Sequence, residues 1–239
     1  MSDVFEDLVD WPKRLAGPFF RRLFASVGAR TVLDAACGTG HHAALFHSWG
    51  LGVEGADISR RMIERARALF GEPKGLRWVV RGYDEPVASR EPFDAVCCVG
   101  NSLALAPDRE SVRRAAVAMA GAVRKGGAVV VHLLNLWRFP EGPSRWQKCR
   151  RTARPEGEAL IVKGVHRCGP HSYAELILAP VACPDSMRTT HLTLTCLEAA
   201  ELEELFRASG ATSVEISGGY DGQPYERETS VDLVLTASF

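Results

Sequence analysis

A carboxylate followed by two glycines stands in the string VLDAACGTG, early in the 239-residue chain. An apolar strand is predicted to end at Asp34, and a helix is expected to begin near His41. Gly38 and Gly40 let the turn between them bend tightly and come close to a ligand without a Cβ in the way. Such a strand-to-helix turn lies at the carboxyl end of a sheet, where open α/β folds bind ligands. Asp34 would repel a pyrophosphate and attract a cation, so the turn indicates a positively charged ligand.

Two other interpretations of this turn stay open. The run GTGHHA over residues 38–43 fits the G-x-G-x-x-A pattern of dinucleotide sites, which would indicate a nicotinamide oxidoreductase. A glycine turn that binds no ligand is the second alternative. The acid before the first glycine favours a cationic ligand over both.

A second acid, Asp57, ends another predicted strand, Gly52 to Asp57. An acid at the tip of this strand can accept hydrogen bonds from both hydroxyls of a ribose. The alternative role is a helix N-cap, but Ser59 is available for that role. If Asp57 binds a ribose, Ile58 and Met62 are expected to flank the adenine. Ordinary core packing is the alternative for Met62.

Strand and helix patterns alternate between residues 31 and 134. Strands are expected at 31–34, 52–57, 76–80, 93–99 and 128–134, and helices at 41–49, 59–70 and 108–123. The run Lys125-Gly126-Gly127 is expected to separate the last of these helices from the last strand. This alternation predicts βαβ units and a parallel sheet.

The pattern changes between residues 146 and 196, where no long helix is expected. Alternating runs at 159–166, 172–181 and 187–196 predict an inserted antiparallel β-meander. A helix at 197–209 and strands at 213–217 and 231–237 would complete a seven-stranded sheet with a reversed last strand. We therefore predict one α/β domain over residues 1–239.

The first 25 residues are expected to form a helical lid on this domain. The run Asp10-Trp11-Pro12 can begin a helix, and Gly17-Pro18 is expected to interrupt it. The charged segment 10–14 is the part expected to be mobile. The stripe that should pack on the sheet consists of Phe19, Phe20, Leu23 and Phe24.

The charge and cysteine content restrict the partners of the chain. Lys plus Arg and Asp plus Glu both number 29, which disfavours electrostatic binding to nucleic acid and favours a small-molecule partner. No apolar run is long enough to cross a membrane, and the acidic N-terminus does not resemble a signal peptide. The seven cysteines lack zinc-type spacing, so no metal site is predicted. Reduced thiols in the cytoplasm are expected instead.

The string DAACGTG resembles motif I of the class I S-adenosylmethionine-dependent methyltransferases. The resemblance implies a Rossmann-like seven-stranded sheet and S-adenosyl-L-methionine as cofactor. It places Asp34 at the amino-acid end of the cofactor, beside the sulfonium. Cys37 is expected to line the cofactor turn as a packing residue. It also implies that an acid after the third strand, here Asp84, binds the adenine amine. Gly100 follows the fourth strand, at the ligand end of the sheet.

A narrower resemblance covers about residues 5 to 137. The segment FDAVCCVGNSLALAPD is similar to glycine N-methyltransferase and its bacterial sarcosine-methylating relatives. The run VDWPKR is similar as well, and it implies that Arg14 grips the carboxylate of the cofactor. The histidine-arginine pair that this group has before Asn135 is replaced by two leucines, which argues against glycine itself as the acceptor. The resemblance fades through the meander, where acceptor specificity is expected.

Methyl transfer from a sulfonium is an in-line displacement, so positioning and exclusion of water supply much of the rate. An amine acceptor must be neutral to attack, and Asn101 or Asn135 can hold it. A hydroxyl acceptor needs a base, and His132 at the end of a predicted strand is the candidate. We expect an amine nitrogen ahead of a hydroxyl oxygen. A cofactor-binding module without turnover, and a homodimer paired through an edge of the meander, stay open.

Overall fold

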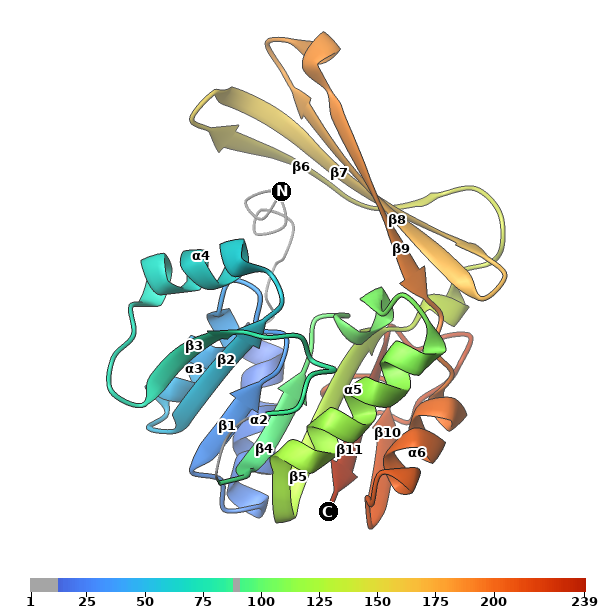
Figure 1. Ribbon diagram of the computed structural model, residues 1–239. Coiled ribbons are helices and arrows are strands. Elements are labelled where there is room, and N and C mark those ends of the chain that lie inside the picture. The colour runs from blue at the N-terminus through green and yellow to red at the C-terminus, as the bar shows by residue number, and fades with distance from the viewer. Residues whose placement is uncertain (1–12, 88–90) are drawn as a thin grey trace. The chain divides into compact units, whose positions relative to one another are not determined.

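A seven-stranded sheet carries most of the chain in the computed structural model, which describes residues 13–87 and 91–239 (Figure 1). Its strand order is β10-β11-β5-β4-β1-β2-β3. The strands are β1 (Thr31–Asp34), β2 (Gly52–Asp57), β3 (Leu76–Val80), β4 (Phe93–Cys98), β5 (Val123–Leu134), β10 (Ser213–Ser217) and β11 (Asp232–Ser238). The pairs among β1 to β5 are parallel, while β11 is antiparallel to both of its neighbours. The predicted Rossmann-like sheet with a reversed last strand is confirmed.

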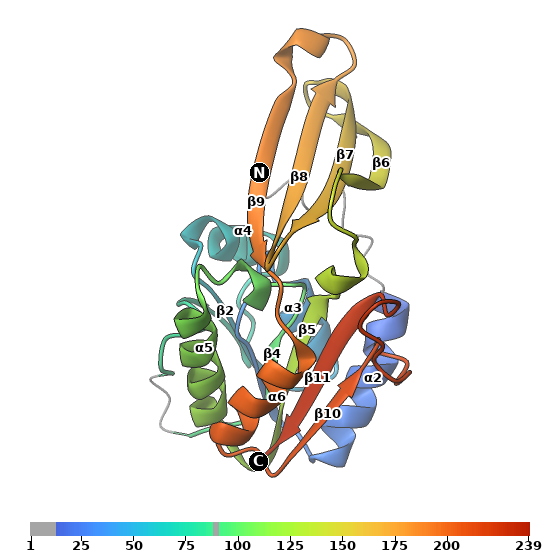
Figure 2. The same ribbon diagram turned by 90° about the vertical axis from the view of Figure 1, so that its right-hand side faces the viewer.

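Helices lie on both faces of this sheet, and Figure 2 shows α2 and α5 on opposite sides of it. They are α2 (Lys13–Ser26), α3 (His41–Ser48), α4 (Arg60–Phe70), α5 (Arg109–Ala122) and α6 (Ala199–Ala208), with a short 3-10 turn η1 (Leu103–Leu105). The first three share one apolar cluster around Phe20, Phe46 and Ile63. The Ser59 hydroxyl and the Asp108 carboxylate accept the N-cap hydrogen bonds of α4 and α5. Among the described helices, none is long and apolar enough to span a membrane.

α2 runs unbroken through Pro18, so the predicted interruption at Gly17-Pro18 is wrong. A proline removes the hydrogen bond to the carbonyl four residues earlier, and here that carbonyl lies in the first turn of the helix. Phe20 and Phe24 then anchor α2, because both rings are buried against Phe46 of α3. This part of the expected lid therefore belongs to the core, while residues 1–12 lie outside the described residues.

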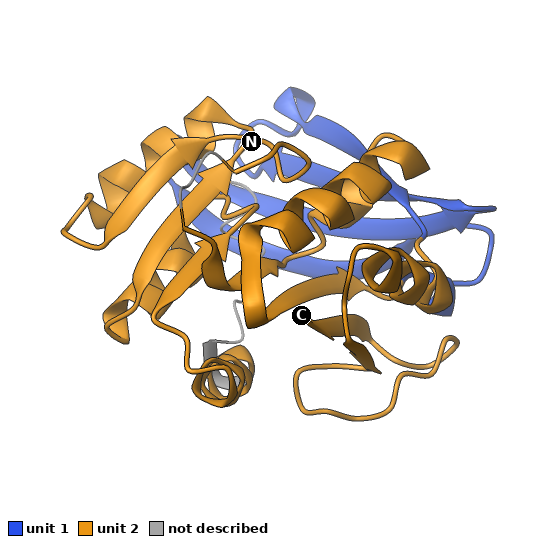
Figure 3. Cartoon of the chain, turned by 60° about the horizontal axis from the view of Figure 1, so that its bottom comes forward, with its two compact units in different colours: residues 1–12, 136–196 blue, residues 13–135, 197–239 orange. Residues whose placement is uncertain are grey.

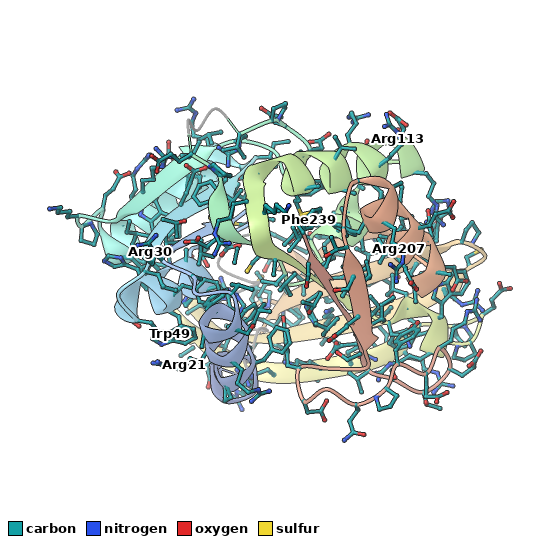
Figure 4. The ribbon with its side chains drawn as sticks, turned by 90° about the horizontal axis from the view of Figure 1, so that it is seen from below. Arg21, Arg30, Trp49, Arg113, Arg207 and Phe239 are labelled. Carbon is teal, nitrogen blue, oxygen red and sulfur yellow. The ribbon has the colours of Figure 1, made fainter. Side chains whose placement is uncertain are left out.

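β5 begins at Val123, directly after α5, whereas the prediction began this strand after the two glycines. Gly126 and Gly127 form an irregularity within the strand, where its register with β4 shifts. A Cβ on Gly127 would lie 2.6 Å from the carbonyl oxygen of Asp94, so glycine is needed for the two strands to approach. The C-terminal Phe239 (Figure 4) pairs with the same glycines, accepting from the Gly126 amide and donating to the Gly127 carbonyl.

The described residues 136–196 form a second compact unit, separate from the unit that holds the seven-stranded sheet (Figure 3). Its antiparallel strands, in spatial order, are β6 (Arg145–Arg154), β7 (Gly157–Cys168), β8 (His171–Pro180) and β9 (Arg188–Thr195), with 3-10 turns η2 (Leu136–Arg138) and η3 (Pro184–Ser186). β7, β8 and β9 agree with the predicted meander. The sequence pattern misses β6, because the string RWQKCRRTAR is rich in charge and mostly exposed. Charged edge strands of this kind resist pairing with further strands.

Candidate active site

The glycine turn joins β1 to α3 at the carboxyl end of the sheet. Gly38 and Gly40 have φ angles of 54° and 88°, a region that strains residues with a Cβ. A Cβ on Gly40 would also lie 2.5 Å from the Trp78 ring, whereas one on Gly38 would meet nothing within 4 Å. Packing therefore requires glycine at position 40, and Gly38 leaves an open approach for a ligand.

Asp34 is a buried carboxylate without a hydrogen-bonding partner. The residue is 1% exposed, and both of its carboxylate oxygens are unpaired within the described part of the chain. Burial, followed by the charge of Asp57, raises its pKa from 3.8 to about 7. The amides of Ala36 and Ala43 oppose this rise in pKa but do not complete hydrogen bonds. Because burying an unpaired carboxylate is costly, a bound cation would supply the missing partner.

Asp57 ends β2 and holds the glycine turn in place. Its Oδ2 accepts from the Gly38 amide at 2.9 Å, and its Oδ1 accepts from the Ser59 amide at 2.8 Å. Each carboxylate oxygen can accept a further hydrogen bond, which leaves capacity for the hydroxyls of a sugar. Ile58 beside it is 73% exposed, so an apolar ring can pack on this side chain. Met62 is only partly exposed.

β4 ends in a strained turn beside β5. Gly100 and Asn101 have φ angles of 76° and 72°, and a positive φ outside glycine is often found at functional sites. The Oδ1 of Asn101 accepts from the Leu134 amide at 3.1 Å, which fixes the turn against β5. The Gly100 amide donates to Nδ1 of His132 at 3.2 Å. The structure thus brings two predicted catalytic residues together at the ligand end of β4 and β5.

Both ring nitrogens of His132 are engaged. Because the Gly100 amide donates to Nδ1, the ring hydrogen lies on Nε2, which faces Oδ1 of Asp232 at 3.3 Å. The Tyr220 ring stacks on the imidazole, with centroids 5.0 Å apart and planes inclined by 22°. A base role for His132 would require one of the two nitrogen contacts to break.

Asn135 differs from the expectation that it holds the acceptor. It is 2% exposed, and its Nδ2 donates to the carbonyls of Arg227 and Ser230 at 2.8 and 2.9 Å. Its Oδ1 accepts from the Tyr225 hydroxyl at 3.2 Å. The amide therefore holds the loop before β11. Its position after β5 suggested a role at the site, but position alone does not reveal that the side chain points into this loop.

Asp84 follows β3 and pairs with Arg114 of α5, with Nη2 and Oδ2 3.0 Å apart. A small cavity lies beside it, between β1, the loop after β3 and α5, and Gly82 and Tyr83 line part of its wall. The ion pair occupies one of the two Asp84 oxygens. The other is available to a polar group in this region.

Two further predicted residues belong to the turn and to α2. Cys37 is buried under the turn, and its thiol hydrogen points to the Gly38 carbonyl, with Sγ 3.7 Å away. Burial, with the charges of Asp34 and Asp57, raises the pKa of this thiol, so packing is the role that the structure supports. Arg14 lies in the first turn of α2, but its side chain lies outside the described residues.

The sequence reasoning missed Trp78, Asp232 and Tyr220. Trp78 of β3 packs against the backbone of Gly40 and Gly55, where a Cβ would lie 2.5 Å from the ring in both cases. That contact follows from the register of β2 and β3, which a single sequence does not show. An aromatic residue among the glycines of GGYDG was the available signal for Tyr220.

Residues 32–127 match a family model described as a methyltransferase domain. They include the glycine turn, both site carboxylates and the strained turn after β4, all within the Rossmann-like sheet. This part of the chain is therefore similar to methyltransferase domains, in agreement with the resemblance of the glycine turn. The match agrees with S-adenosyl-L-methionine as the cofactor that the resemblance of the turn implied. The match favours a methyltransferase turn over the dinucleotide interpretation.

The names of the curated relatives describe N-methyltransferases of glycine and sarcosine. The glycine/sarcosine N-methyltransferase of Parasynechococcus marenigrum is 33% identical over 150 residues, which is 60% of this chain and 52% of the relative. The glycine N-methyltransferase of Oryctolagus cuniculus is 28% identical over 221 residues, which is 83% of this chain and 75% of the relative. The chain thus spans about half the length of the first relative.

A solved structure shows the same fold over nearly the whole chain. It is the S-adenosylmethionine-bound CalS10, an amino pentose methyltransferase from Micromonospora echinaspora, with a TM-score of 0.72 and 21% identity. The match covers 97% of this chain and 92% of CalS10. At this identity the likeness concerns the fold.

Proposed function

We propose that the chain is a small-molecule N-methyltransferase, which transfers a methyl group from S-adenosylmethionine to an amine nitrogen. The names of the curated relatives support an amine acceptor, and the fold neighbour CalS10 is described as acting on an amino pentose. The balance of 29 basic and 29 acidic residues suits a small acceptor better than a nucleic acid. Leu133 and Leu134 argue against glycine itself.

The engagement of His132 is the observation that carries the choice of nitrogen over oxygen. A hydroxyl acceptor must lose a proton to a base as it attacks, and both nitrogens of His132 are held by Gly100 and Asp232. A neutral amine attacks with its own lone pair, and its proton can leave to water afterwards. The site as built therefore suits an amine.

We assign cofactor-binding roles to residues whose oxygen atoms can accept a further hydrogen bond or whose side chains are at least partly exposed. The bound cofactor supplies an electrophilic methyl group on a sulfonium. Asp34 compensates its positive charge, because this carboxylate is buried without another partner. Asp57 accepts from the ribose hydroxyls through its remaining lone pairs. Ile58 and Met62 pack on the adenine, and the second oxygen of Asp84 accepts from the adenine amine.

The chain then has to hold a neutral amine in line with the methyl carbon and exclude water. The Oδ1 of Asn101 accepts one hydrogen bond from Leu134 and has a second lone pair for an acceptor N–H. The nitrogen lone pair forms the new C–N bond as the C–S bond breaks, which leaves S-adenosylhomocysteine. The resulting ammonium loses its proton to water.

We further propose that the four-stranded sheet determines which acceptor is used. Trp146, Gly164, Glu175 and His191 form one row across its four strands and share a face. Trp146 is 59% exposed, and its ring lies over Gly164, where a Cβ would be 3.0 Å away. Oε2 of Glu175 accepts from the Ser144 hydroxyl at 2.7 Å. A carboxylate beside an exposed indole can accept a hydrogen bond from an N–H of a neutral amine whose carbon skeleton packs on the ring.

The test of the proposed function is methyl transfer from isotopically labelled S-adenosylmethionine to a panel of amino sugars and amino acids. Each amine is matched with the alcohol of the same skeleton. Label is expected in N-methyl products of one or more amines and in none of the alcohols. Label in the alcohols alone would overturn the choice of nitrogen. Cofactor binding without transfer to any member would favour a binding module.

A single substitution tests the proposed role of the four-stranded sheet in binding the acceptor. Glu175→Gln is expected to raise the KM for the best amine about tenfold or more, as loss of a charged contact of roughly 1.5–3 kcal/mol predicts. Its affinity for S-adenosylhomocysteine should be unchanged. Glu158→Gln, an exposed glutamate of β7, is the matched control. An unchanged KM in Glu175→Gln would contradict the assignment.

Location and assembly also remain proposals. The described residues contain no disulfide bond, and Cys149, Cys168 and Cys183 of the four-stranded unit are exposed, which supports a reducing cytoplasm. A homodimer would use the open β9 edge of the four-stranded sheet, because the charged β6 edge resists pairing. Analytical ultracentrifugation distinguishes a dimer from a monomer directly.

A further inference from the structure

The Tyr220 side chain, in the loop between β10 and β11, is fixed by its ring. The ring stacks on His132 at 5.0 Å and contacts Phe19 and Phe20 of α2, with centroids 5.2 and 5.6 Å away. It also packs against the apolar cluster that contains Cys97 of β4. Because three elements of the core hold the ring, its hydroxyl has a defined place at the ligand end of the sheet.

Strand register puts His132 and Asp34 on one face of the sheet. Asp34 pairs with Cys97, and Cys97 pairs with Val130 of β5. Side chains two residues apart on a strand share a face, so His132 shares the face of Val130 and Asp34. The ring stacked on His132 therefore lies on the side of the sheet that carries the unpaired carboxylate.

Both carboxylate oxygens of Asp34 are buried without a partner, and the Tyr220 hydroxyl makes no hydrogen bond to a described residue. Burial, followed by Cys97, Asp232 and Asp34, raises the pKa of the hydroxyl well above its ordinary value. Tyr220 is therefore a neutral phenol at physiological pH. Two unpartnered groups on the same side of the ligand end indicate that a ligand completes both of them.

We propose that the Tyr220 hydroxyl is a cofactor-binding group, whose oxygen faces the positively charged sulfonium while Asp34 compensates the charge of the same end of the cofactor. The partial negative charge of the oxygen attracts the sulfonium and its polarised C–H groups. S-adenosylhomocysteine has a neutral thioether instead, so the contact favours S-adenosylmethionine over the product. The inference rests on the cofactor assignment and is independent of the acceptor.

The loop supplies a matched pair of variants for the test. Tyr220→Phe keeps the stacked ring and removes only the unpartnered hydroxyl. Tyr225→Phe removes the hydroxyl that donates to Asn135. Calorimetric titration of the full chain measures the affinity of each variant for S-adenosylmethionine and for S-adenosylhomocysteine. Melting curves verify that the variants are folded.

Tyr220→Phe is expected to weaken S-adenosylmethionine binding about three- to fivefold, which weak contacts of this kind support. Its affinity for S-adenosylhomocysteine should stay within about twofold, and Tyr225→Phe should change neither affinity. Equal losses for both ligands, or no loss, would overturn the proposal. These binding results need no acceptor. They therefore leave the choice of nitrogen over oxygen unaffected, and that choice is tested by the product analysis alone.

Discussion

At the scale of single residues, Asp34 and Asp57 have opposite surroundings although they stand beside each other. Asp57 accepts two backbone hydrogen bonds, and Asp34 is buried without a partner. The first carboxylate stabilises the ligand-free turn, while burial of the second destabilises the folded chain. Asp57 therefore has a structural role in the turn, and Asp34 is the carboxylate that we propose pairs with the cofactor.

The Asp34 carboxylate predicts a pH dependence of the ligand-free protein. Its pKa is about 7 when folded and near its ordinary 3.8 when unfolded, so the native state binds more protons between these values. The contribution of Asp34 to stability must therefore fall as pH rises from about 4 to 7, by up to roughly 4 kcal/mol at 1.36 kcal/mol per pKa unit. Asp34→Asn should remove this fall and weaken S-adenosylmethionine binding.

Urea denaturation at pH 5 and pH 8 measures the effect on stability. Asp221→Asn, an exposed acid in the β10–β11 loop, serves as the control and should keep the wild-type pH dependence. If Asp34→Asn keeps it as well, the carboxylate is already ionised and paired in solution.

Asp57→Ala should lower the affinity for S-adenosylhomocysteine at least tenfold, because two charge-assisted hydrogen bonds to the ribose are lost. The structure adds a loss of stability, since the Gly38 and Ser59 amides lose their acceptor. Ser59→Ala separates the two effects: loss of the N-cap costs about 1 kcal/mol without touching the ribose. Thermal melting measures the stability of each variant, and calorimetric titration measures its affinity for S-adenosylhomocysteine. A folded Asp57→Ala protein with normal affinity would exclude the ribose role.

At the scale of elements, the turn between β1 and α3 contains two glycines that are required for different reasons: Gly40 by packing and Gly38 by its backbone conformation. Gly40→Ala must collide with Trp78, so it should destabilise the protein by about 1–3 kcal/mol for overpacking, with backbone strain in addition. Gly38→Ala has only the strain of its positive φ, roughly 1–2 kcal/mol. Its new methyl group should instead obstruct the cofactor. In melting measurements Gly40→Ala should lose more stability than Gly38→Ala, and in binding measurements Gly38→Ala should lose more affinity for the cofactor. Equal losses of affinity in the two variants would contradict the assignment.

The same elements show what a sequence can predict. Apolar runs such as VLD and FDAVCC, with acids and glycines at their ends, locate the strands and the ligand edge because hydrophobic pattern and turn chemistry are local. β6 was missed because an exposed edge strand needs no apolar pattern. The burial of Asn135 and the stacking of Tyr220 on His132 were not predictable, since both depend on a loop that returns from ninety residues further along the chain. Only tertiary structure brings those residues together.

At the scale of the whole molecule, the chain leaves the seven-stranded sheet after β5, forms the four-stranded unit and returns at α6. We predict that replacing residues 146–196 with a short Gly-Ser linker spares S-adenosylhomocysteine binding and abolishes methyl transfer. The cofactor contacts assigned above all lie in the seven-stranded unit, which explains the first half of the expectation. Calorimetry and product analysis on the same preparation measure both. Full-rate transfer to the same amine by the shortened protein would exclude an acceptor role for this unit.

The distribution of cysteines makes the protein ready for site-selective spectroscopy. Cys37, Cys97 and Cys98 are buried in the seven-stranded unit, and burial raises the pKa of all three thiols, which suppresses their reaction with electrophiles. The exposed thiols all belong to the four-stranded unit. A maleimide dye added to the native chain would therefore label that unit alone. Energy transfer from such a dye to a fluorescent cofactor analogue would then report, without any engineered cysteine, how far the two units stand apart during a catalytic cycle.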